Sequence, residues 1–357
     1  MTAPFLSERH SAPGDARETT DLTVIVPAYN EAAHIAETIR SLADQTVRPA
    51  RILVVDDCST DETGAIARDM GADVVRPEAN TGSKAGAQTL ALTRVDTEFC
   101  MAVDADTVLA PDAVEQIMKA MADPAVAAAC GFVVPRRVRS VWERGRYVEY
   151  LFAFGFLKRV QDNYGRPMIS SGCFSAYRTE TLRRVGGWRD RTLAEDVDLT
   201  WTLYDAGWKV RFVPEAVCYP VEPPTYHFLR KQLRRWSHGF LQNVRLHWRD
   251  IRHDGYLAST VAVATWDAVV ASIVFLFALP LLAVLVDPAF LLGYVIDAPV
   301  VLVPVAVAAV RRREPVRALV SYPSFLVLRV VNAGFMLKAF WLEFVVRKPL
   351  VGYEKGH

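Results

Sequence analysis

Two aspartates, Asp104 and Asp106, stand on either side of one alanine, directly after the apolar run 98–103. Carboxylates this close repel each other, so a pair that faces a cleft is commonly neutralised by a cation. Their oxygens suit Mg²⁺ or Mn²⁺, either of which can bridge to the phosphates of a substrate. The pair is therefore a candidate Mg²⁺ or Mn²⁺ site, although an acidic turn in solvent is the commoner arrangement for such a pair taken alone.

A second acidic pair and a lysine-bearing turn have the chemistry of a nucleotide site. Asp56 and Asp57 follow the apolar run 51–55, where a carboxylate can accept hydrogen bonds from a ribose hydroxyl or a base N–H. The segment 80–84, Asn-Thr-Gly-Ser-Lys, opens a helical pattern with a glycine turn and Lys84, which favours anion binding. Neither the Walker A pattern nor GxGxxG occurs, which disfavours a P-loop enzyme and a nicotinamide enzyme.

The acidic run 195–198, Glu-Asp-Val-Asp, precedes a helical pattern. One of its three acids, Glu195, Asp196 or Asp198, could act as a general base if this helix start faces a cleft. The alternative is that these acids only complement the positive end of the helix dipole.

Three residues of a basic segment share one helix face. Gln232, Arg235 and Trp236 are spaced i, i+3, i+4, so an arginine able to neutralise a diphosphate lies beside an indole on which a sugar can stack. The alternative is that arginine and tryptophan sit at a membrane surface. Between residues 228 and 253, seven Lys or Arg stand against one acid, Asp250, which favours a membrane-surface helix over a nucleic-acid site.

The elements that must position these residues alternate along the first part of the chain. Short β-branched runs predict strands at 22–27, 51–55, 72–75 and 98–103, and amphipathic runs predict helices at 31–42, 61–70, 84–93 and 111–121. Ser59 or Thr60 is expected to cap the second helix, and Pro111 to open the fourth. The alternation predicts an α/β fold with a mostly parallel sheet, whose carboxyl ends gather the polar residues.

The apolar excess is concentrated at the end of the chain. The 357 residues are 52% apolar and 23% charged, with mean hydropathy +0.14, which excludes a disordered chain. Ala268–Val286 is uncharged and long enough to cross a bilayer, and 289–310 is a weaker second span. The alternative is a buried hairpin. Residues 319–346 predict a tilted span, an interfacial helix or two short pieces, because charged residues interrupt them: Arg329, Lys338 and Glu343.

Charge also predicts orientation. Four arginines follow the second span at 311–313 and 317, which places that loop and everything before residue 258 in the cytoplasm. The N-terminus has no apolar leader segment. Five scattered cysteines without CxxC spacing predict reduced thiols.

The motifs occur in an order that resembles the family-two membrane glycosyltransferases, the group of the cellulose, chitin, hyaluronan and poly-N-acetylglucosamine synthases. The resemblance covers about 22–250 and the following spans. It is carried by Val24–Glu31, Val54–Asp61, Asp104–Asp106, Ser171–Arg178, Glu195–Asp196, and Gln232 with Arg235–Trp236.

The resemblance implies a GT-A-type nucleotide-sugar domain and a role for each matching residue. Asp104 and Asp106 would hold the metal, with Asp104 also at the donor, and Asp196 would be the catalytic base beside Glu195. Gly172 and Cys173 would lie near the acceptor, with Trp236 also touching the acceptor sugar. The donor would be bound by Pro27, Ala28, Tyr29, Glu31, Asp56, Asp57, Lys84, Asp104, Gln232, Arg235 and Trp236.

The implied reaction is a single displacement that inverts the anomeric centre, from a nucleotide-diphosphate sugar, with UDP expected, to a hydroxyl of a glycan or lipid acceptor. The helix predicted at 141–160 would form the acceptor entrance at the membrane surface, and a plain core helix is the alternative. A nucleotidyltransferase and an inactive membrane scaffold are the competing functions. The implied partners are the donor, the acceptor and membrane lipids, with no nucleic acid.

The implied location is a bacterial inner membrane, with the catalytic domain in the cytoplasm. We expect a flexible tail at 1–20, a catalytic domain at 21–227, a basic interfacial region at 228–257 and a membrane region at 258–357 with two or three spans. The large synthases carry spans before the catalytic domain as well, and this sequence has none there. We therefore expect addition of one or a few sugars, with processive synthesis in an oligomer or with a partner as the alternative.

Overall fold

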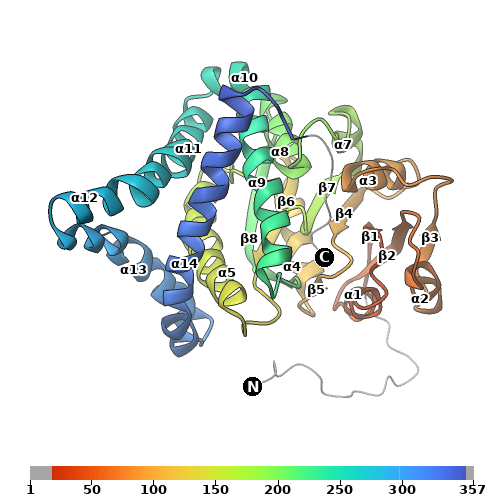
Figure 1. Ribbon diagram of the computed structural model, residues 1–357. Coiled ribbons are helices and arrows are strands. Elements are labelled where there is room, and N and C mark those ends of the chain that lie inside the picture. Colours follow the sequence, from red (N-terminus) through yellow and green to blue (C-terminus); the bar gives the residue numbers. More distant parts are fainter. Residues whose placement is uncertain (1–17, 297, 351–357) are drawn as a thin grey trace.

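The computed structural model describes residues 18–296 and 298–350 (Figure 1). Most of the predicted tail at 1–20, and Asp297 of the second apolar stretch, lie outside the described residues.

One eight-stranded sheet forms the centre of the fold, in the order β3-β2-β1-β4-β7-β6-β8-β5. Strands β1, β2, β3 and β4 are parallel neighbours, β6 and β8 are parallel, and β7 runs antiparallel between β4 and β6. The predicted α/β fold with a mostly parallel sheet is confirmed. The strands are β1 (Thr19–Ala28), β2 (Arg48–Asp56), β3 (Asp73–Val75), β4 (Phe99–Val103), β5 (Val108–Leu109), β6 (Val126–Val133), β7 (Phe174–Arg178) and β8 (Lys209–Tyr219).

Helices bury both faces of the sheet. Val24 and Val26 of β1 belong to one buried cluster and Ile25 to the other, because successive strand residues point to opposite faces. The first cluster includes side chains of α1 (Ile35–Ala43), α2 (Thr63–Asp69) and α4 (Ala113–Met121). The second includes side chains of α3 (Lys84–Leu92), α7 (Thr179–Arg184) and α8 (Glu195–Asp205).

Two predicted helix starts are wrong. Ser59 and Thr60 do not cap α2: the Ser59 hydroxyl accepts the N–H of Asn30 at 3.0 Å, and the N–H of Thr60 donates to Asn30 Oδ1 at 2.8 Å. These two residues therefore tie the end of β2 to the end of β1. Pro111 likewise precedes its helix, which begins at Ala113.

The helix predicted at 141–160 forms as α5 (Val141–Phe152) and continues helically into α6 (Lys158–Asp162). Ser140 and Glu143 make a reciprocal capping box at its start. One side of α5 is core, since Tyr147, Val148 and Leu151 are buried.

Three helical stretches among the described residues are long and apolar enough to cross a membrane. They are 255–285, which contains α11 (Gly255–Thr265) and α12 (Leu279–Leu285), then 288–311, which contains α13 (Ala298–Arg311), and 315–345, which contains α14 (Pro315–Phe340). Figure 1 shows α11, α12 and α13 as a hairpin that projects away from the sheet.

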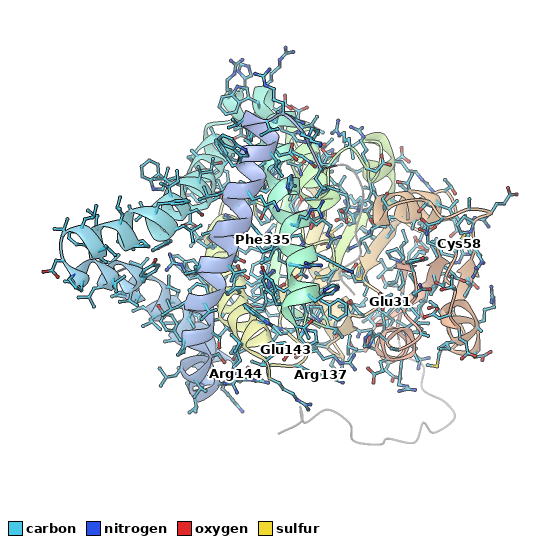
Figure 2. The ribbon with its side chains drawn as sticks, viewed as in Figure 1. Glu31, Cys58, Arg137, Glu143, Arg144 and Phe335 are labelled. Carbon is cyan, nitrogen blue, oxygen red and sulfur yellow. The ribbon has the colours of Figure 1, made fainter. Side chains whose placement is uncertain are left out.

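Helix α14 follows a different course from the hairpin. It lies alongside α5 and α9 (Tyr226–Leu246), at the base of the hairpin (Figure 1). Before its first turn, Glu314 accepts a hydrogen bond of 2.8 Å from the Tyr147 hydroxyl on α5. Beyond its last turn, Glu343 accepts one of 2.7 Å from the Gln242 amide on α9. Phe335 of α14, labelled in Figure 2, packs against a buried cluster formed by Leu229 and Leu233 of α9 with Leu328 of α14.

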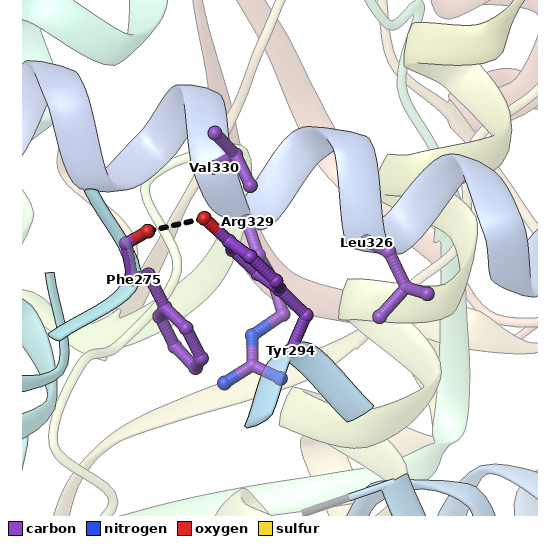
Figure 3. Close-up of a pocket in the computed structure, with 5 residues that line it drawn as sticks. All are labelled: Phe275, Tyr294, Leu326, Arg329 and Val330. Atoms are coloured by element: carbon purple, nitrogen blue, oxygen red, sulfur yellow. Dashed lines mark hydrogen bonds between the residues drawn. The ribbon is translucent and has the colours of Figure 1, made fainter. Parts of the chain in front are cut away.

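A pocket between α14 and the hairpin is lined by Phe275, Tyr294, Leu326, Arg329 and Val330 (Figure 3). The Tyr294 hydroxyl donates to the carbonyl of Phe275 at 2.5 Å, and the Arg329 guanidinium lies 4.6 Å from the Phe275 ring centre. The pocket is lined by residues of the apolar stretches alone.

Candidate active site

The carboxyl ends of β1 and β2 meet at one edge of the sheet, where Ala28 is paired with Asp56. Pro27 is half-buried and Ala28 is buried at the end of β1. Tyr29 follows with 39% exposure. Glu31 is buried, and its N–H donates to the Thr63 hydroxyl at 2.7 Å. Of these residues, Tyr29 has the side chain most accessible to a ligand.

The two aspartates after β2 have different surroundings. Asp56 is 1% exposed, forms a 2.6 Å ion pair with Arg76 and accepts a hydrogen bond from the N–H of Ser59. Its buried side chain therefore stabilises the loop that follows β2. Asp57 accepts both the N–H and the hydroxyl of Thr81, at 2.8 and 2.9 Å. Asp57 therefore joins the end of β2 to the turn that leads to Lys84.

Lys84 is the centre of a charged cluster. Its ammonium forms an ion pair with Asp104, lies 3.8 Å from Glu195 and donates to the carbonyl of Gly172 at 2.9 Å. Lys84 lies in the first turn of α3, which Ser83 caps by accepting the N–H of Gly86. Four predicted site residues from distant parts of the sequence are thus brought together.

Asp196 joins this cluster through the loop before β7. One of its oxygens accepts the N–H of Gly172 at 3.1 Å, and the other accepts the N–H of Val197 at 2.9 Å. The carbonyl of Cys173 accepts the N–H of Asp104 at 3.3 Å. The predicted acceptor residues Gly172 and Cys173 therefore lie between Asp104 and Asp196.

The acids that open α8 do not share one environment. Burial raises the pKa of Glu195. The negative charge of Asp196 raises this pKa further, whereas the positive charges of Lys84 and Arg235 lower it. Asp198 is also desolvated, but hydrogen bonds from His247 and Arg191 hold its pKa below the usual range. Asp198 is thus a structural acid, while Glu195 and Asp196 face the cluster around Lys84.

Asp104 and Asp106 offer two sets of carboxylate oxygens at the end of β4. The side chain of Asp104 is one-third exposed, and Asp106 is 9% exposed with an oxygen 3.2 Å from the Thr107 hydroxyl. Among the described residues no group of three or more His, Cys, Asp or Glu has the arrangement of a complete metal site. Two carboxylates fit Mg²⁺ or Mn²⁺ when substrate phosphates and water supply the other oxygens.

Helix α9 brings the basic motif to this edge. Gln232, Arg235 and Trp236 are each half-buried, and the charge of Arg235 acts on Glu195. The helix is tied to the loop before α8, where the Asn243 amide donates to the carbonyl of Ala194 at 3.0 Å. A Cβ at Gly239 would lie 2.7 Å from that of Ala194, so only glycine allows this approach.

Sequence reasoning missed three residues that hold α9. Gly239 and Asn243 carried a signal, a glycine inside a helix with a short amide four residues later. Arg146 of α5 is the third. It is 1% exposed, donates to Gln232 Oε1 at 3.2 Å and places its guanidinium 4.4 Å from the centre of the Trp236 ring. Its only signal was a charged pair, Arg146 and Glu149, in an aromatic helix.

Known proteins resemble this chain in sequence and in fold. The family model described as glycosyl transferase family group 2 matches residues 100–308, more than half of the chain. The poly-beta-1,6-N-acetyl-D-glucosamine synthase of Staphylococcus epidermidis (strain RP62A) is 28% identical over 231 residues, covering 62% of this chain and 55% of that protein. The same enzyme of Staphylococcus aureus (strain COL) is 26% identical over 227 residues. The chain thus spans about half the length of the curated relatives it matches.

Among solved structures, the mannosyltransferase PcManGT from Pyrobaculum calidifontis, in complex with GDP-Man and Mn2+, superposes with a TM-score of 0.60 at 21% identity. The match covers 92% of this chain and 88% of that one, so the likeness of fold includes the apolar helices. The fold is of the GT-A type, followed by three long apolar helices. With more than half of its length matched by the family model, the chain belongs to glycosyl transferase family group 2.

Proposed function

We propose that this glycosyltransferase moves a sugar from a nucleotide-diphosphate sugar to a hydroxyl of a glycan or lipid acceptor, with inversion and with Asp196 as base. The observation that carries the proposal is the cluster in which Lys84 contacts both Asp104 and the Gly172 carbonyl while Asp196 accepts the Gly172 N–H. In this proposal the cluster would bring the base Asp196, the cation Lys84 and the metal ligand Asp104 together around one loop.

In this reaction Asp196 takes the proton of the acceptor hydroxyl as its oxygen bonds to the anomeric carbon. The bond from that carbon to the diphosphate breaks on the opposite face, and the nucleotide diphosphate leaves with the electron pair. Lys84 and Arg235 stabilise the developing negative charge. The Gly172 N–H fixes Asp196 so that the proton acceptor is in place before the reaction.

The donor pocket is proposed at the edge formed by the ends of β1 and β2. Tyr29 and Asp57 would contact the nucleoside, supported by Pro27, Ala28, Glu31 and Asp56. Asp104 and Asp106 would hold a Mg²⁺ or Mn²⁺ ion, whose chemistry is to neutralise the diphosphate. PcManGT, which was solved with GDP-Man and Mn2+, supports a nucleotide sugar and a divalent ion here.

The relatives support a specific first test of the sugar. Two poly-beta-1,6-N-acetyl-D-glucosamine synthases align with this chain, so N-acetylglucosamine from UDP is the first donor to try. The alignment spans 55% of the S. epidermidis enzyme, so polymer synthesis does not transfer with it. We expect one or a few additions, and a long product would favour processive synthesis in an oligomer or with a partner.

The hairpin 255–311 is proposed to anchor the protein in the membrane, while α14 lies along the membrane surface. Both flanks of α14 are hydrogen-bonded to α5 or α9, which belong to the catalytic body and carry many charges. At 1.5 Å per residue the 26 residues of α14 form a rod of about 39 Å, and a continuous helix cannot cross a bilayer while both of its ends lie on the same side. The apolar stretch 319–346 is thus proposed as an interfacial helix.

The experiment measures nucleotide-diphosphate release by the detergent-purified protein from a panel of UDP- and GDP-sugars with Mn²⁺. Asp196→Asn should abolish release that depends on an added acceptor. Asp205→Asn, an exposed aspartate at the end of the same helix, is the matched control. Full activity of Asp196→Asn would reject the proposed base. Absence of release and of binding with every donor would favour an inactive scaffold.

A further inference from the structure

We infer that Arg146 is a positioning residue that holds Gln232 and Trp236 of α9 and covers one face of the Trp236 ring, leaving the opposite face for an acceptor sugar. This inference rests on the proposed function, in which Trp236 touches the acceptor.

Arg146 is enclosed by groups that fix its guanidinium. It is 1% exposed, pairs with Glu149 on its own helix and lies 3.9 Å from Glu222, which is 4% exposed. Glu222 also accepts a hydrogen bond of 2.8 Å from the Tyr150 hydroxyl. The guanidinium is hydrogen-bonded to Glu149, attracted by the charge of Glu222 and buried, so it has little freedom to rotate and can act as a fixed surface for its neighbours.

The fixed guanidinium contacts two of the three residues of the motif. One terminal nitrogen donates to Gln232 Oε1 at 3.2 Å, and the carbon centre lies 4.4 Å from the centre of the Trp236 ring. That distance is within the range of a cation–π contact, which is strengthened where water is excluded. One ring face is therefore occupied by protein, and a sugar can stack only on the other.

Arginine is required here for its shape as well as its charge. A planar guanidinium can lie over a ring and hydrogen-bond sideways to Gln232 at the same time, whereas the compact ammonium of lysine cannot do both. The support also extends to α14, because the Asn332 amide donates to Glu149 at 3.1 Å. Arg146 thus sets the depth and tilt of the platform for the acceptor, while Lys84 and Asp104 serve the donor.

The test compares Arg146→Met and Arg146→Lys, using UDP-N-acetylglucosamine as donor and an N-acetylglucosamine tetrasaccharide as acceptor. Loss of a buried platform contact should raise the KM for the tetrasaccharide about tenfold in Arg146→Met, with a smaller rise in Arg146→Lys. The KM for the donor should change less than about twofold. Arg144→Met, half-exposed on the same helix (Figure 2), is the matched control.

Arg146→Met leaves Glu222 buried without its cation, so a second variant guards against unfolding. Arg146→Met with Glu222→Gln removes one positive and one negative charge together, so the net charge of the site is unchanged, and it should show the same selective rise in the acceptor KM. A double-mutant comparison then tests whether Arg146 acts through Trp236. If it does, the protein carrying both Arg146→Met and Trp236→Ala should have the same acceptor KM as the protein carrying Trp236→Ala alone. The inference would be overturned if the acceptor KM of the double variant rose by the product of the two single effects, or if Arg146→Met raised the donor KM as much as the acceptor KM.

A spectroscopic measurement separates this inference from the proposed function. The ¹⁵N-labelled indole N–H signal of Trp236, identified by its loss in Trp236→Phe, should shift in Arg146→Met and stay in place in Arg144→Met. If the wild-type protein turns over no donor, the proposed function fails while this signal still reports the contact. An unshifted Trp236 signal would show that Arg146 does not hold the ring.

Discussion

The backbone N–H of Gly172 donates a hydrogen bond of 3.1 Å to Asp196 Oδ2, and a Cβ on Gly172 would lie 3.1 Å from that same oxygen. The same Cβ would lie 3.3 Å from the ammonium of Lys84. Glycine at this position therefore lets the loop donate to the proposed base and receive Lys84 at once.

Replacing Gly172 by alanine should disturb Asp196 more than it disturbs the fold. The added methyl group presses on both the carboxylate and the ammonium, so we expect kcat to fall by about tenfold to a hundredfold, as for a misplaced catalytic group. Gly255→Ala is the control, since nothing lies within 4 Å of a Cβ there. Steady-state diphosphate release measures the effect, and equal kcat in both variants would contradict it.

Asp104→Asn should remove the dependence of turnover on Mn²⁺ along with most of the turnover. Asp104 pairs with Lys84, and the amide of asparagine is a poorer ligand for a hard cation. A Mn²⁺ titration of donor turnover measures this, with Asp112→Asn on another loop as control. Wild-type activity with an unchanged Mn²⁺ response would reject Asp104 as a ligand.

The sequence predicted the parts of this site that depend on local order. Tyr29, Asp57 and Asp104 lie at the carboxyl edge because each directly follows a strand, and strands of this kind are recognisable from composition. The Lys84–Asp104 ion pair and the Arg146–Trp236 contact could not be predicted, since they depend on how separate helices pack. Composition likewise could not separate a spanning helix from an apolar one lying along α9.

Stability should depend on pH through Glu195. Burial, partly opposed by Lys84, raises its pKa in the folded protein, so the protonated form is favoured by folding. The contribution of Glu195 is fully present below its unfolded pKa and is lost as pH rises through the folded one. Glu195→Gln should therefore gain in Tm relative to the wild type as the pH rises above 4.5, the ordinary pKa of a glutamate. A thermal-shift series in detergent checks this, and a Tm difference that does not change with pH would contradict it.

Asn243→Ala should destabilise the contact between α9 and the loop before α8. The fully buried Asn243 amide donates to the carbonyls of Ala194 and Gly239, and also to the Thr192 hydroxyl at 3.1 Å. Leaving such groups unpaired costs about 1–3 kcal/mol, so Tm should fall by several degrees. Arg230→Ala, exposed on the same helix, should leave Tm unchanged. A stable Asn243→Ala protein would show that this tie is dispensable.

The side of the membrane on which α14 ends is open to a direct test. Glu314 and Glu343, which flank it, bond to α5 and α9, so a green fluorescent protein fused after residue 357 should fluoresce in the cytoplasm. An alkaline phosphatase inserted at Asp287, between the two helices of the hairpin, should be active outside. A fusion truncated after Arg313 is the control, because it ends before α14 and should fluoresce equally. A dark fluorescent protein after residue 357, with active phosphatase at the same place, would mean that α14 crosses the membrane.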